Sequence, residues 1–357
     1  SGNVTFSGNT AGTDGGAIYN TGILNISSGT TFANNSAANS GGAIYNASNL
    51  TNTITGATFT GNKSLFVPTE DENVWNHGGG AIYNATGSNI TISDSTFGGD
   101  NTADGNTAYI GGAIYNNGTL TLSGTNVFKN NNANGNTGNG GAIVSYNGTT
   151  TIGAGTQFIS NSAFHGGALY TVAGTYKIEG TLFQNNTVTG HGGAINSSNK
   201  GNNTITAATF IENTATHGGA IYNLDSTLSI DNSTFTGNRA ARGGAVANIA
   251  TGNMTLTDNV FGSAGAGNSA TKYGGAIYNE GTLTIVSDKK DTIFTDNTAA
   301  EKGDDIYSTG TLNFKGTMNT NITGGIAGSG TINKQESGTL SLKGDNAGYT
   351  GTTNIEA

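Results

Sequence analysis

Histidine is the residue type in this chain that is hardest to explain as packing, because imidazole binds metal ions and changes charge near neutral pH. Three of the four histidines, His165, His191 and His217, each stand immediately before the Gly-Gly of a repeat motif. If successive copies lie on successive coils of one structure, the imidazoles are about 4.8 Å apart. This spacing predicts either a shared metal ion at His165, His191 and His217 or a plain hydrated turn.

Carboxylates recur in a similar way at Asp231, Asp258 and Asp291, three or four residues before successive phenylalanines. Carboxylates together with turn carbonyls are ligands that calcium prefers, whereas acidic turn residues are ordinarily just hydrated. The calcium-binding nonapeptide pattern Gly-Gly-x-Gly-x-Asp does not occur.

The segment Lys63 to His77 differs in composition from the rest of the chain. It contains the one proline, the one tryptophan, an acidic run and several apolar residues. This mixture is typical of a surface that contacts a partner. The ligand-binding residues expected here are Phe66, Glu70, Asp71, Glu72 and Trp75.

Tyrosines form a second candidate surface within the recurring motif Gly-Gly-Ala-Ile-Tyr-Asn. The Ile is replaced only by Leu169 and Val246, so it faces the core, and strand alternation sends Ala and Tyr outward. Asp305, at the Ala position of the last copy, agrees with this interpretation. Exposed tyrosines suit protein or sugar contact, although they could also merely cover the sheet or lie under inserted loops. The expected stripe is Tyr19, Tyr45, Tyr83, Tyr115, Tyr170, Tyr222, Tyr278 and Tyr307.

The repeat that positions these residues also contains Phe-x-x-Asn, and its period is 27 residues from Phe183 to Phe210 and 25 from Phe210 to Phe235 (210 − 183 and 235 − 210). Three short strands separated by turns fit such a period. We therefore expect an all-β, right-handed parallel β-helix of about 11 to 14 coils. Residues 1–307 carry the motifs, and 308–357 continue the strand rhythm with a different cross-section.

Three columns of this β-helix are expected to be structural. The phenylalanines form an internal aromatic ladder. The Asn of Phe-x-x-Asn sits at a turn, where it tolerates left-handed backbone and passes amide hydrogen bonds between coils. Gly-Gly forms a tight corner that side chains would obstruct. Insertions occur between each Phe and the next Gly-Gly, and this predicts that they project from one corner of the coil.

Composition narrows the class of protein further. The formal charge of −9 argues against nucleic acid and anionic lipid as partners. The absence of cysteine fits a secreted bacterial protein, and no apolar run approaches the length of a membrane span. The chain starts inside a repeat and shows no signal peptide, so we expect a fragment of a longer exported protein.

The paired motifs Gly-Gly-Ala-Ile and Phe-x-x-Asn, from Phe6 to Tyr307, resemble the repeats of chlamydial polymorphic outer-membrane proteins, which are autotransporter (type V secretion) proteins. The segment Gly338 to Ile355 is similar to a repeat associated with autotransporter passengers. The resemblance implies an adhesin passenger displayed on the bacterial cell surface. Its partners would be a host-cell surface protein, matrix or a glycan.

Two functions other than adhesion are compatible with such a solenoid. Long polar solenoids rich in Thr and Asn can self-associate along their sides through many hydrogen bonds, which would aggregate cells. A polysaccharide-active enzyme needs carboxylates gathered on neighbouring coils. Only scattered candidates such as Glu179 and Glu212 fall within strands. No enzyme activity and no cofactor are therefore expected.

Overall fold

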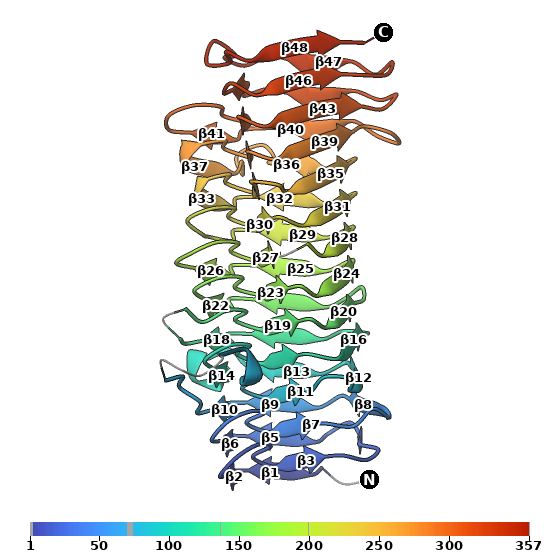
Figure 1. The fold of residues 1–357 in the computed structure, drawn as a ribbon, viewed down its shortest axis with the longest axis vertical. Coiled ribbons are helices and arrows are strands. Elements are labelled where there is room, and N and C mark those ends of the chain that lie inside the picture. The colour runs from blue at the N-terminus through green and yellow to red at the C-terminus, as the bar shows by residue number, and fades with distance from the viewer. Residues whose placement is uncertain (1–2, 70–73, 136, 199, 357) are drawn as a thin grey trace. The chain divides into compact units, whose positions relative to one another are not determined.

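The computed structural model describes residues 3–69, 74–135, 137–198 and 200–356. They form two compact units, one of residues 1–182 with 186–188 and the other of residues 183–185 with 189–357. In each unit short strands stack in parallel sheets, one strand per sheet from each coil (Figure 1). The chain is thus an all-β parallel solenoid of about 12 coils, as the repeat predicts.

The first unit contains four sheets. Sheet A comprises β1 (Thr5–Ser7), β5 (Thr31–Ala33), β9 (Thr58–Thr60), β13 (Thr96–Gly98), β17 (Val127–Lys129) and β21 (Gln157–Ile159). Sheet B comprises β2 (Thr10–Ala11), β6 (Ser36–Ala37), β10 (Lys63–Ser64), β14 (Thr107–Ala108), β18 (Asn132–Ala133), β22 (Ser162–Ala163) and β26 (Thr187–Val188). Sheet C comprises β3 (Ile18–Asn20), β7 (Ile44–Asn46), β11 (Ile82–Asn84), β15 (Ile114–Asn116), β19 (Ile143–Tyr146) and β23 (Leu169–Val172). Sheet D comprises β4 (Asn25–Ile26), β8 (Thr51–Thr55), β12 (Asn89–Ser93), β16 (Thr119–Ser123), β20 (Thr149–Ile152) and β24 (Thr175–Glu179).

The second unit repeats this plan, and β25 (Leu182–Gln184) spans the boundary. Its sheet A comprises β29 (Thr209–Ile211), β32 (Thr234–Thr236), β36 (Val260–Phe261), β40 (Thr292–Phe294), β44 (Thr320–Ile322) and β47 (Leu340–Leu342). Sheet B comprises β33 (Arg239–Arg242), β37 (Ser269–Tyr273) and β41 (Thr298–Ala299). Sheet C comprises β27 (Ile195–Ser198), β30 (Ile221–Leu224), β34 (Val246–Ile249), β38 (Ile277–Asn279), β42 (Ile306–Ser308) and β45 (Ile326–Ala327). Sheet D comprises β28 (Asn202–Thr206), β31 (Thr227–Asp231), β35 (Asn253–Thr257), β39 (Thr282–Val286), β43 (Thr311–Lys315), β46 (Thr331–Lys334) and β48 (Thr352–Ile355).

Most coils therefore have four strands, not the three that the sequence predicted. The additional strand belongs to sheet B and is often only two residues long, as in Ser36–Ala37. Two residues are too few to show a period-two pattern, so this strand has no sequence signature. Among the described residues after Ser308, the strands continue sheets A, C and D but not sheet B.

Phenylalanine rings form the predicted ladder behind sheet A. Phe59 and Phe97 are fully buried and stack with centroids 4.6 Å apart and planes within 1°. The second unit repeats the arrangement, with Phe210 and Phe235 4.7 Å apart. Each buried ring contributes on the order of 2 to 3 kcal/mol of transfer free energy.

The Asn of Phe-x-x-Asn forms a buried hydrogen-bonded ladder, as predicted. The Asn62 amide nitrogen donates to Asn106 Oδ1 at 2.9 Å and to the Phe32 carbonyl at 2.9 Å. The prediction of left-handed backbone at this Asn was wrong by one residue. The preceding position is left-handed, as at Asn34 (φ 54°), so the bend falls one residue earlier and leaves the side chain of Asn35 fully buried.

Gly-Gly forms the predicted tight corner between sheets B and C. The first glycine is left-handed, with φ of +63° at Gly41. A Cβ on the second, Gly42, would lie 2.1 Å from the Gly80 carbonyl oxygen of the next coil. The close stacking of successive corners therefore excludes any side chain here.

The alanine of the motif faces the core, so the expectation that it faces outward was wrong. Ala43 and Ala81 are fully buried. Asp305, which takes the same position, is also fully buried, and its Oδ1 accepts a hydrogen bond from the buried Asn297 at 2.8 Å. Strand alternation does not apply to this position, because the alanine belongs to the irregular corner before the strand begins.

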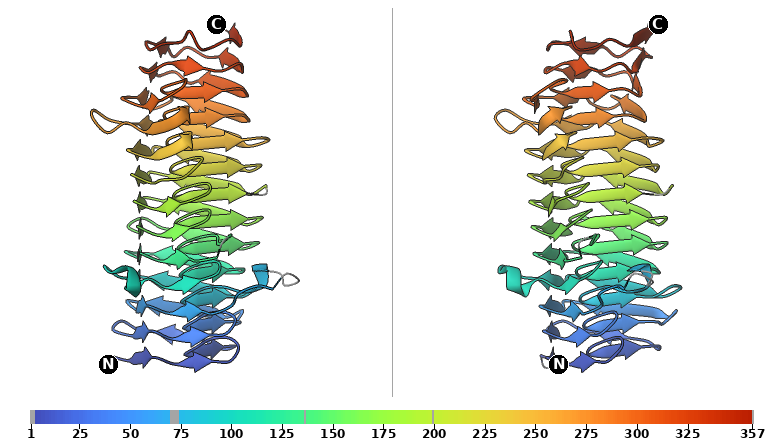
Figure 2. Two further views of the ribbon diagram at one scale, coloured as in Figure 1. Left: turned by 90° about the vertical axis from the view of Figure 1, so that its left-hand side faces the viewer. Right: turned by 60° about the vertical axis from the view of Figure 1, so that its left-hand side comes forward.

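Insertions leave the coil at two corners, one on each side of sheet B. The segments Lys63 to His77 and Asn132 to Asn139 follow the B strand, whereas Thr102 to Ile110 and Gly262 to Tyr273 begin before it. In Figure 2 the short helices η1 (Val74–Asn76) and η2 (Thr102–Asp104) of the first unit protrude on opposite sides of sheet B. The one-corner prediction was wrong because it treated everything between Phe and Gly-Gly as a single turn.

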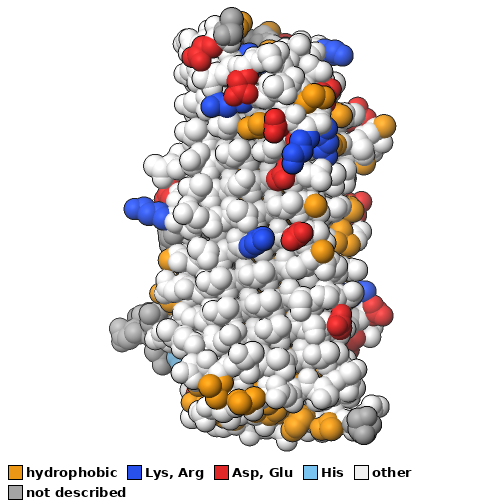
Figure 3. All heavy atoms as spheres, turned by 90° about the vertical axis from the view of Figure 1, so that its right-hand side faces the viewer, with side chains coloured by type: hydrophobic (Ala, Val, Ile, Leu, Met, Phe, Trp, Pro, Cys, Tyr) orange, Lys and Arg blue, Asp and Glu red, His pale blue; other side chains and the backbone are white. Residues whose placement is uncertain are grey.

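The outer face of sheet D carries small polar side chains in register. In the first unit Thr53, Thr91, Thr121 and Thr151 occupy one column. Figure 3 shows that charged and hydrophobic side chains are sparse across this face. No helix among the described residues has the length and apolarity needed to cross a membrane.

Candidate binding surface

The insertion that begins at β10 folds back onto its own unit. Phe66 is 8% exposed, and its ring stacks on His77 with centroids 3.9 Å apart. Trp75, at the other end of the segment, stacks on Tyr146 at 5.1 Å and on Tyr170 at 6.0 Å. Glu70, Asp71 and Glu72, three of the expected ligand-binding residues, lie outside the described residues. The two aromatic residues expected to bind a ligand thus act as anchors of the loop.

The tyrosines of sheet C in the first unit form a stack that becomes progressively covered. Exposure is 57% at Tyr19, intermediate at Tyr45, 6% at Tyr83 and 0% at Tyr115. Burial raises the pKa of Tyr83 and of Tyr115, which keeps both hydroxyls protonated. The expectation of an exposed stripe was therefore wrong for Tyr83 and Tyr115. It was wrong in the second unit as well for Tyr222 and Tyr278, which are 7% and 6% exposed.

The covering side chains explain this burial. Tyr83 and Tyr115 pack in one cluster with Ile110 and Val144, and Trp75 packs against the cluster from outside. The Tyr115 hydroxyl donates a hydrogen bond to the backbone carbonyl of Trp75. Tyr rings in this column also stack face to face, with 4.9 Å between Tyr45 and Tyr83. Only ring edges face outward, and this disfavours the stacking of a sugar on the ring faces.

Where the tyrosine column is interrupted by a smaller residue, a long side chain from elsewhere in the chain covers the gap. Val144 replaces Tyr in the first unit, and Trp75 covers it. In the second unit Asn196 pairs with Tyr222, and the His191 ring stacks on Tyr222 at 4.6 Å. Each filler comes from outside the strand that it covers.

Ala247 is another interruption of the tyrosine column, and it pairs with Tyr222 and Tyr278 in sheet C. The Arg242 guanidinium lies 5.5 Å from the Tyr278 ring centroid and 6.0 Å from that of Tyr273. Ala247 is fully buried as a result. The column of residues that precedes Gly-Gly therefore acts as an outer cover of sheet C.

His191 and His217 lie on neighbouring coils of the second unit, as predicted, with ring centroids 4.8 Å apart and planes within 19°. Parallel stacked rings point their nitrogens in similar directions, which is a poor arrangement for binding one ion between them. Burial lowers the pKa of His191. Within the described residues no group of three or more His, Cys, Asp or Glu side chains is placed to hold a metal. His165 lies in the first unit, where it contacts Phe164 at 4.4 Å and Tyr170 at 6.3 Å.

Two of the three aspartates expected to bind calcium, Asp258 and Asp291, accept hydrogen bonds from turn amides, whereas Asp231 ends β31. Asp258 is buried, and its carboxylate accepts hydrogen bonds from the backbone N–H groups of Asp288 and Lys289 at 2.7 and 3.2 Å. Asp291 accepts from Asn319 at 2.9 Å. These contacts order the turns between sheets D and A, so both carboxylates have a structural role there.

The Chlamydia polymorphic membrane protein (Chlamydia_PMP) repeat family matches the chain six times. The matched residues are 3–21, 29–47, 56–85, 180–198, 207–224 and 266–280. The chain thus carries repeats of the polymorphic membrane protein type. Polymorphic membrane protein repeats on a parallel β-helix fit a passenger-like surface protein of the autotransporter kind, and the family suggests outer-membrane or surface association.

Proteins with polymorphic membrane protein repeats are typically non-enzymatic. Of the two carboxylates expected within strands, Glu179 ends β24 in the first unit, and Glu212 occupies a left-handed turn in the second unit (φ 54°). Neither the curated proteins nor the solved structures include a significant match to the chain.

Sequence reasoning missed several members of the surface. Tyr109, Ile110 and Tyr146 pack around the Trp75 contact but belong to no repeat motif. The one available signal was that Ile110 and Arg242 stand in the same column as the histidines, immediately before Gly-Gly.

Proposed function

We propose that this chain is a surface-displayed adhesin, in which the coils form a scaffold and the insertions beside sheet B contact a host-cell, matrix or glycan ligand. The repeats and the fold support a passenger-like surface protein. The uniform coil has few distinguishing features outside its insertions, so recognition is assigned to the segments that project from it.

One observation carries the proposal. The insertion after β10 is anchored by the buried Phe66 and by Trp75, yet it holds Leu65 at 54% and Val67 at 73% exposure. Apolar side chains held out from an anchored loop are typical of a binding surface, because their burial on contact is favourable and little loop ordering is then required.

Binding of the purified chain to cultured cells, immobilised matrix proteins and a glycan array tests the proposal. The variant Leu65→Ser/Val67→Ser is expected to lose at least about tenfold in affinity, since two apolar contacts are removed. Ile23→Ser/Leu50→Ser is the matched control, because these two side chains are also exposed in the first unit but lie outside the insertion. Equal binding by both variants would place recognition elsewhere.

A second candidate function, self-association, is favoured by the outer face of sheet D. Thr53, Thr91, Thr121 and Thr151 offer hydroxyl groups in register without intervening charge. Two such faces can exchange many hydrogen bonds. Sedimentation velocity is expected to show concentration-dependent dimers that Thr91→Arg/Thr121→Arg abolishes, and a monomer at all concentrations excludes this function.

A further inference from the structure

Four of the thirteen basic residues lie on sheet B or at its junction with sheet C in the second unit. We call Arg239, Arg242, Lys272 and Lys302 the basic corner. Arg242 pairs in register with Tyr273, and Tyr273 pairs with Lys302, so three successive coils contribute to one column. Lys272 adjoins Tyr273, and its carbonyl accepts the N–H groups of Glu301 and Lys302 at 3.0 and 3.3 Å. This clustering contrasts with the formal charge of −9 for the chain.

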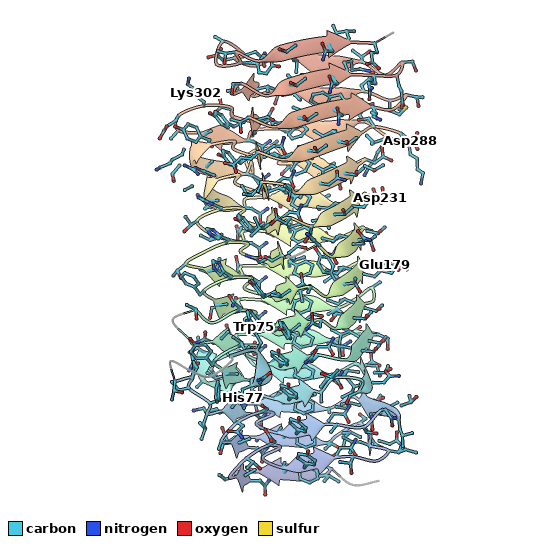
Figure 4. The ribbon with its side chains drawn as sticks, in the orientation of Figure 1. Trp75, His77, Glu179, Asp231, Asp288 and Lys302 are labelled. Carbon is cyan, nitrogen blue, oxygen red and sulfur yellow. The ribbon has the colours of Figure 1, made fainter. Side chains whose placement is uncertain are left out.

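The cations of the basic corner are accessible to solvent and are not neutralised by ion pairs among the described residues. Arg239, Lys272 and Lys302 are exposed, and Arg242 is partly exposed. Figure 4 shows Lys302 on the outside of its coil. Within the part of the chain that the structure describes, none of the four forms an ion pair. Unpaired cations held on a rigid sheet keep their hydrogen-bond donors for a ligand.

Aromatic rings hold the central cation in place. The Arg242 guanidinium lies over the Tyr278 and Tyr273 rings, so its side chain is partly ordered before any ligand binds. A guanidinium presents a planar fork of N–H groups that matches a carboxylate with two parallel hydrogen bonds. Tyr273 and Tyr307, which are half-buried and stack at 4.7 Å, border the same surface.

Three nearby carboxylates limit the charge density that the corner accepts. The Tyr278 hydroxyl donates to Glu280 at 2.6 Å, Glu301 is the partner of the Tyr273 hydroxyl, and Asp304 accepts from the Ala299 N–H at 2.8 Å. The closely spaced sulfates of a heavily sulfated polymer would lie near these carboxylates and be repelled by them. A polysaccharide with one carboxylate per disaccharide has its charges more widely spaced. Such spacing suits Arg242 and Lys302, which are two coils, about 9.6 Å, apart.

We propose that the basic corner binds an acidic polysaccharide that carries uronate residues, laid across successive coils of the second unit. The Arg242 fork pairs with one carboxylate, while Lys272 and Lys302 contact a neighbouring carboxylate or ring hydroxyl groups. The proposal rests on the adhesin function and names the class of ligand at a surface other than the Lys63 to His77 insertion.

Calorimetric titration of the full chain with hyaluronan oligosaccharides, which are unsulfated and carry one carboxylate per disaccharide, tests the proposal. Lys272→Gln/Lys302→Gln is expected to weaken binding at least about tenfold, because two charge-assisted contacts are lost. Arg242→Lys keeps the charge but loses the fork, so a smaller loss of several-fold is expected. Lys289→Gln/Lys290→Gln is the matched control, since it removes the same charge from the turn between sheets D and A of the same unit.

Equal losses in the Lys272/Lys302 variant and the control would overturn the proposal, because they would show non-specific attraction. Stronger binding of heparin than of the hyaluronan oligosaccharides, or binding of phosphatidylserine vesicles only, would also overturn it. Cell adhesion is measured in parallel. Adhesion that survives Lys272→Gln/Lys302→Gln but is lost in Leu65→Ser/Val67→Ser would refute the glycan assignment and leave the adhesin function standing.

Discussion

The indole of Trp75 lies parallel to the phenol ring of Tyr146, with centroids 5.1 Å apart and planes within 6°. This contact joins a non-repeating insertion to the repeating sheet C. It lies beside Val144, where the tyrosine column is interrupted, and it helps to bury Tyr115. An irregular segment therefore completes the packing of the regular one.

Replacement of Trp75 by Ala should lower the free energy of unfolding by about 2 to 3 kcal/mol, since a large partly buried aromatic side chain is lost. Trp75→Phe keeps a stacking ring and should cost about half as much. Urea denaturation followed by far-UV circular dichroism measures the difference. An unchanged midpoint for Trp75→Ala would show that the loop is not anchored through this contact.

Replacement of Asn131 by Ala should lower the unfolding free energy by about 3 kcal/mol, because it leaves several buried groups unpaired. The Asn131 amide donates to the Phe97 carbonyl at 2.9 Å and to Asn161 at 3.0 Å, and its Oδ1 accepts from Asn106 at 2.9 Å. Asn132→Ala, one residue along on the outward side, should cost less than about 1 kcal/mol. Comparable losses in thermal melts of both variants would contradict the ladder.

Replacement of Gly42 by Ala should be destabilising by about 3 kcal/mol or more, because the new Cβ meets backbone on two sides. It would lie 2.1 Å from the Gly80 carbonyl oxygen and 2.5 Å from the Lys63 backbone. Gly12→Ala is the control, since nothing lies within 4 Å of its Cβ. The yield of folded protein and its melting temperature report the difference, and equal values for the two variants would argue against stacked Gly-Gly corners.

His217 should make the chain less stable as pH falls from about 6.5 to about 4. Loss of hydration lowers the pKa of His217 from 6.5 to about 4, and His191, Arg242 and Lys272 add to the shift while Glu280 opposes it. Between these values the unfolded state takes up a proton that the folded state refuses, so stability is full above the unfolded pKa and declines below it. Because the His217 side chain is partly exposed, the effect is expected to be on the order of 1 kcal/mol.

The measurement for His217 is the difference in urea midpoint between the wild-type chain and His217→Gln at pH 7.5 and pH 4.5. The variant should show a smaller decline, since glutamine does not titrate. Identical declines would mean that carboxylates alone govern the acid response.

The repeated motifs determined the regular part of this protein from sequence alone. In a solenoid each residue of a motif has its own copies as neighbours, so the pattern predicts the Phe59 to Phe97 stack, the Asn62 to Asn106 hydrogen bond and the Gly41-Gly42 corner. The two-residue strands of sheet B and the inward alanine escaped prediction, because neither follows strand alternation. The left-handed turn position was predicted one residue too late, and the two corners that carry insertions were taken for one.

The tertiary structure alone decided which of the outward-facing residues are exposed to solvent and which are covered by other side chains. Tyr83 and Tyr19 occupy equivalent positions in the repeat, yet one is covered and the other is open. Their difference comes from what lies outside them, and Trp75, His191 and Arg242 reach the tyrosine column from positions that its own strands do not contain. Side-chain cover depends on non-local packing, which a motif repeated along the chain does not encode.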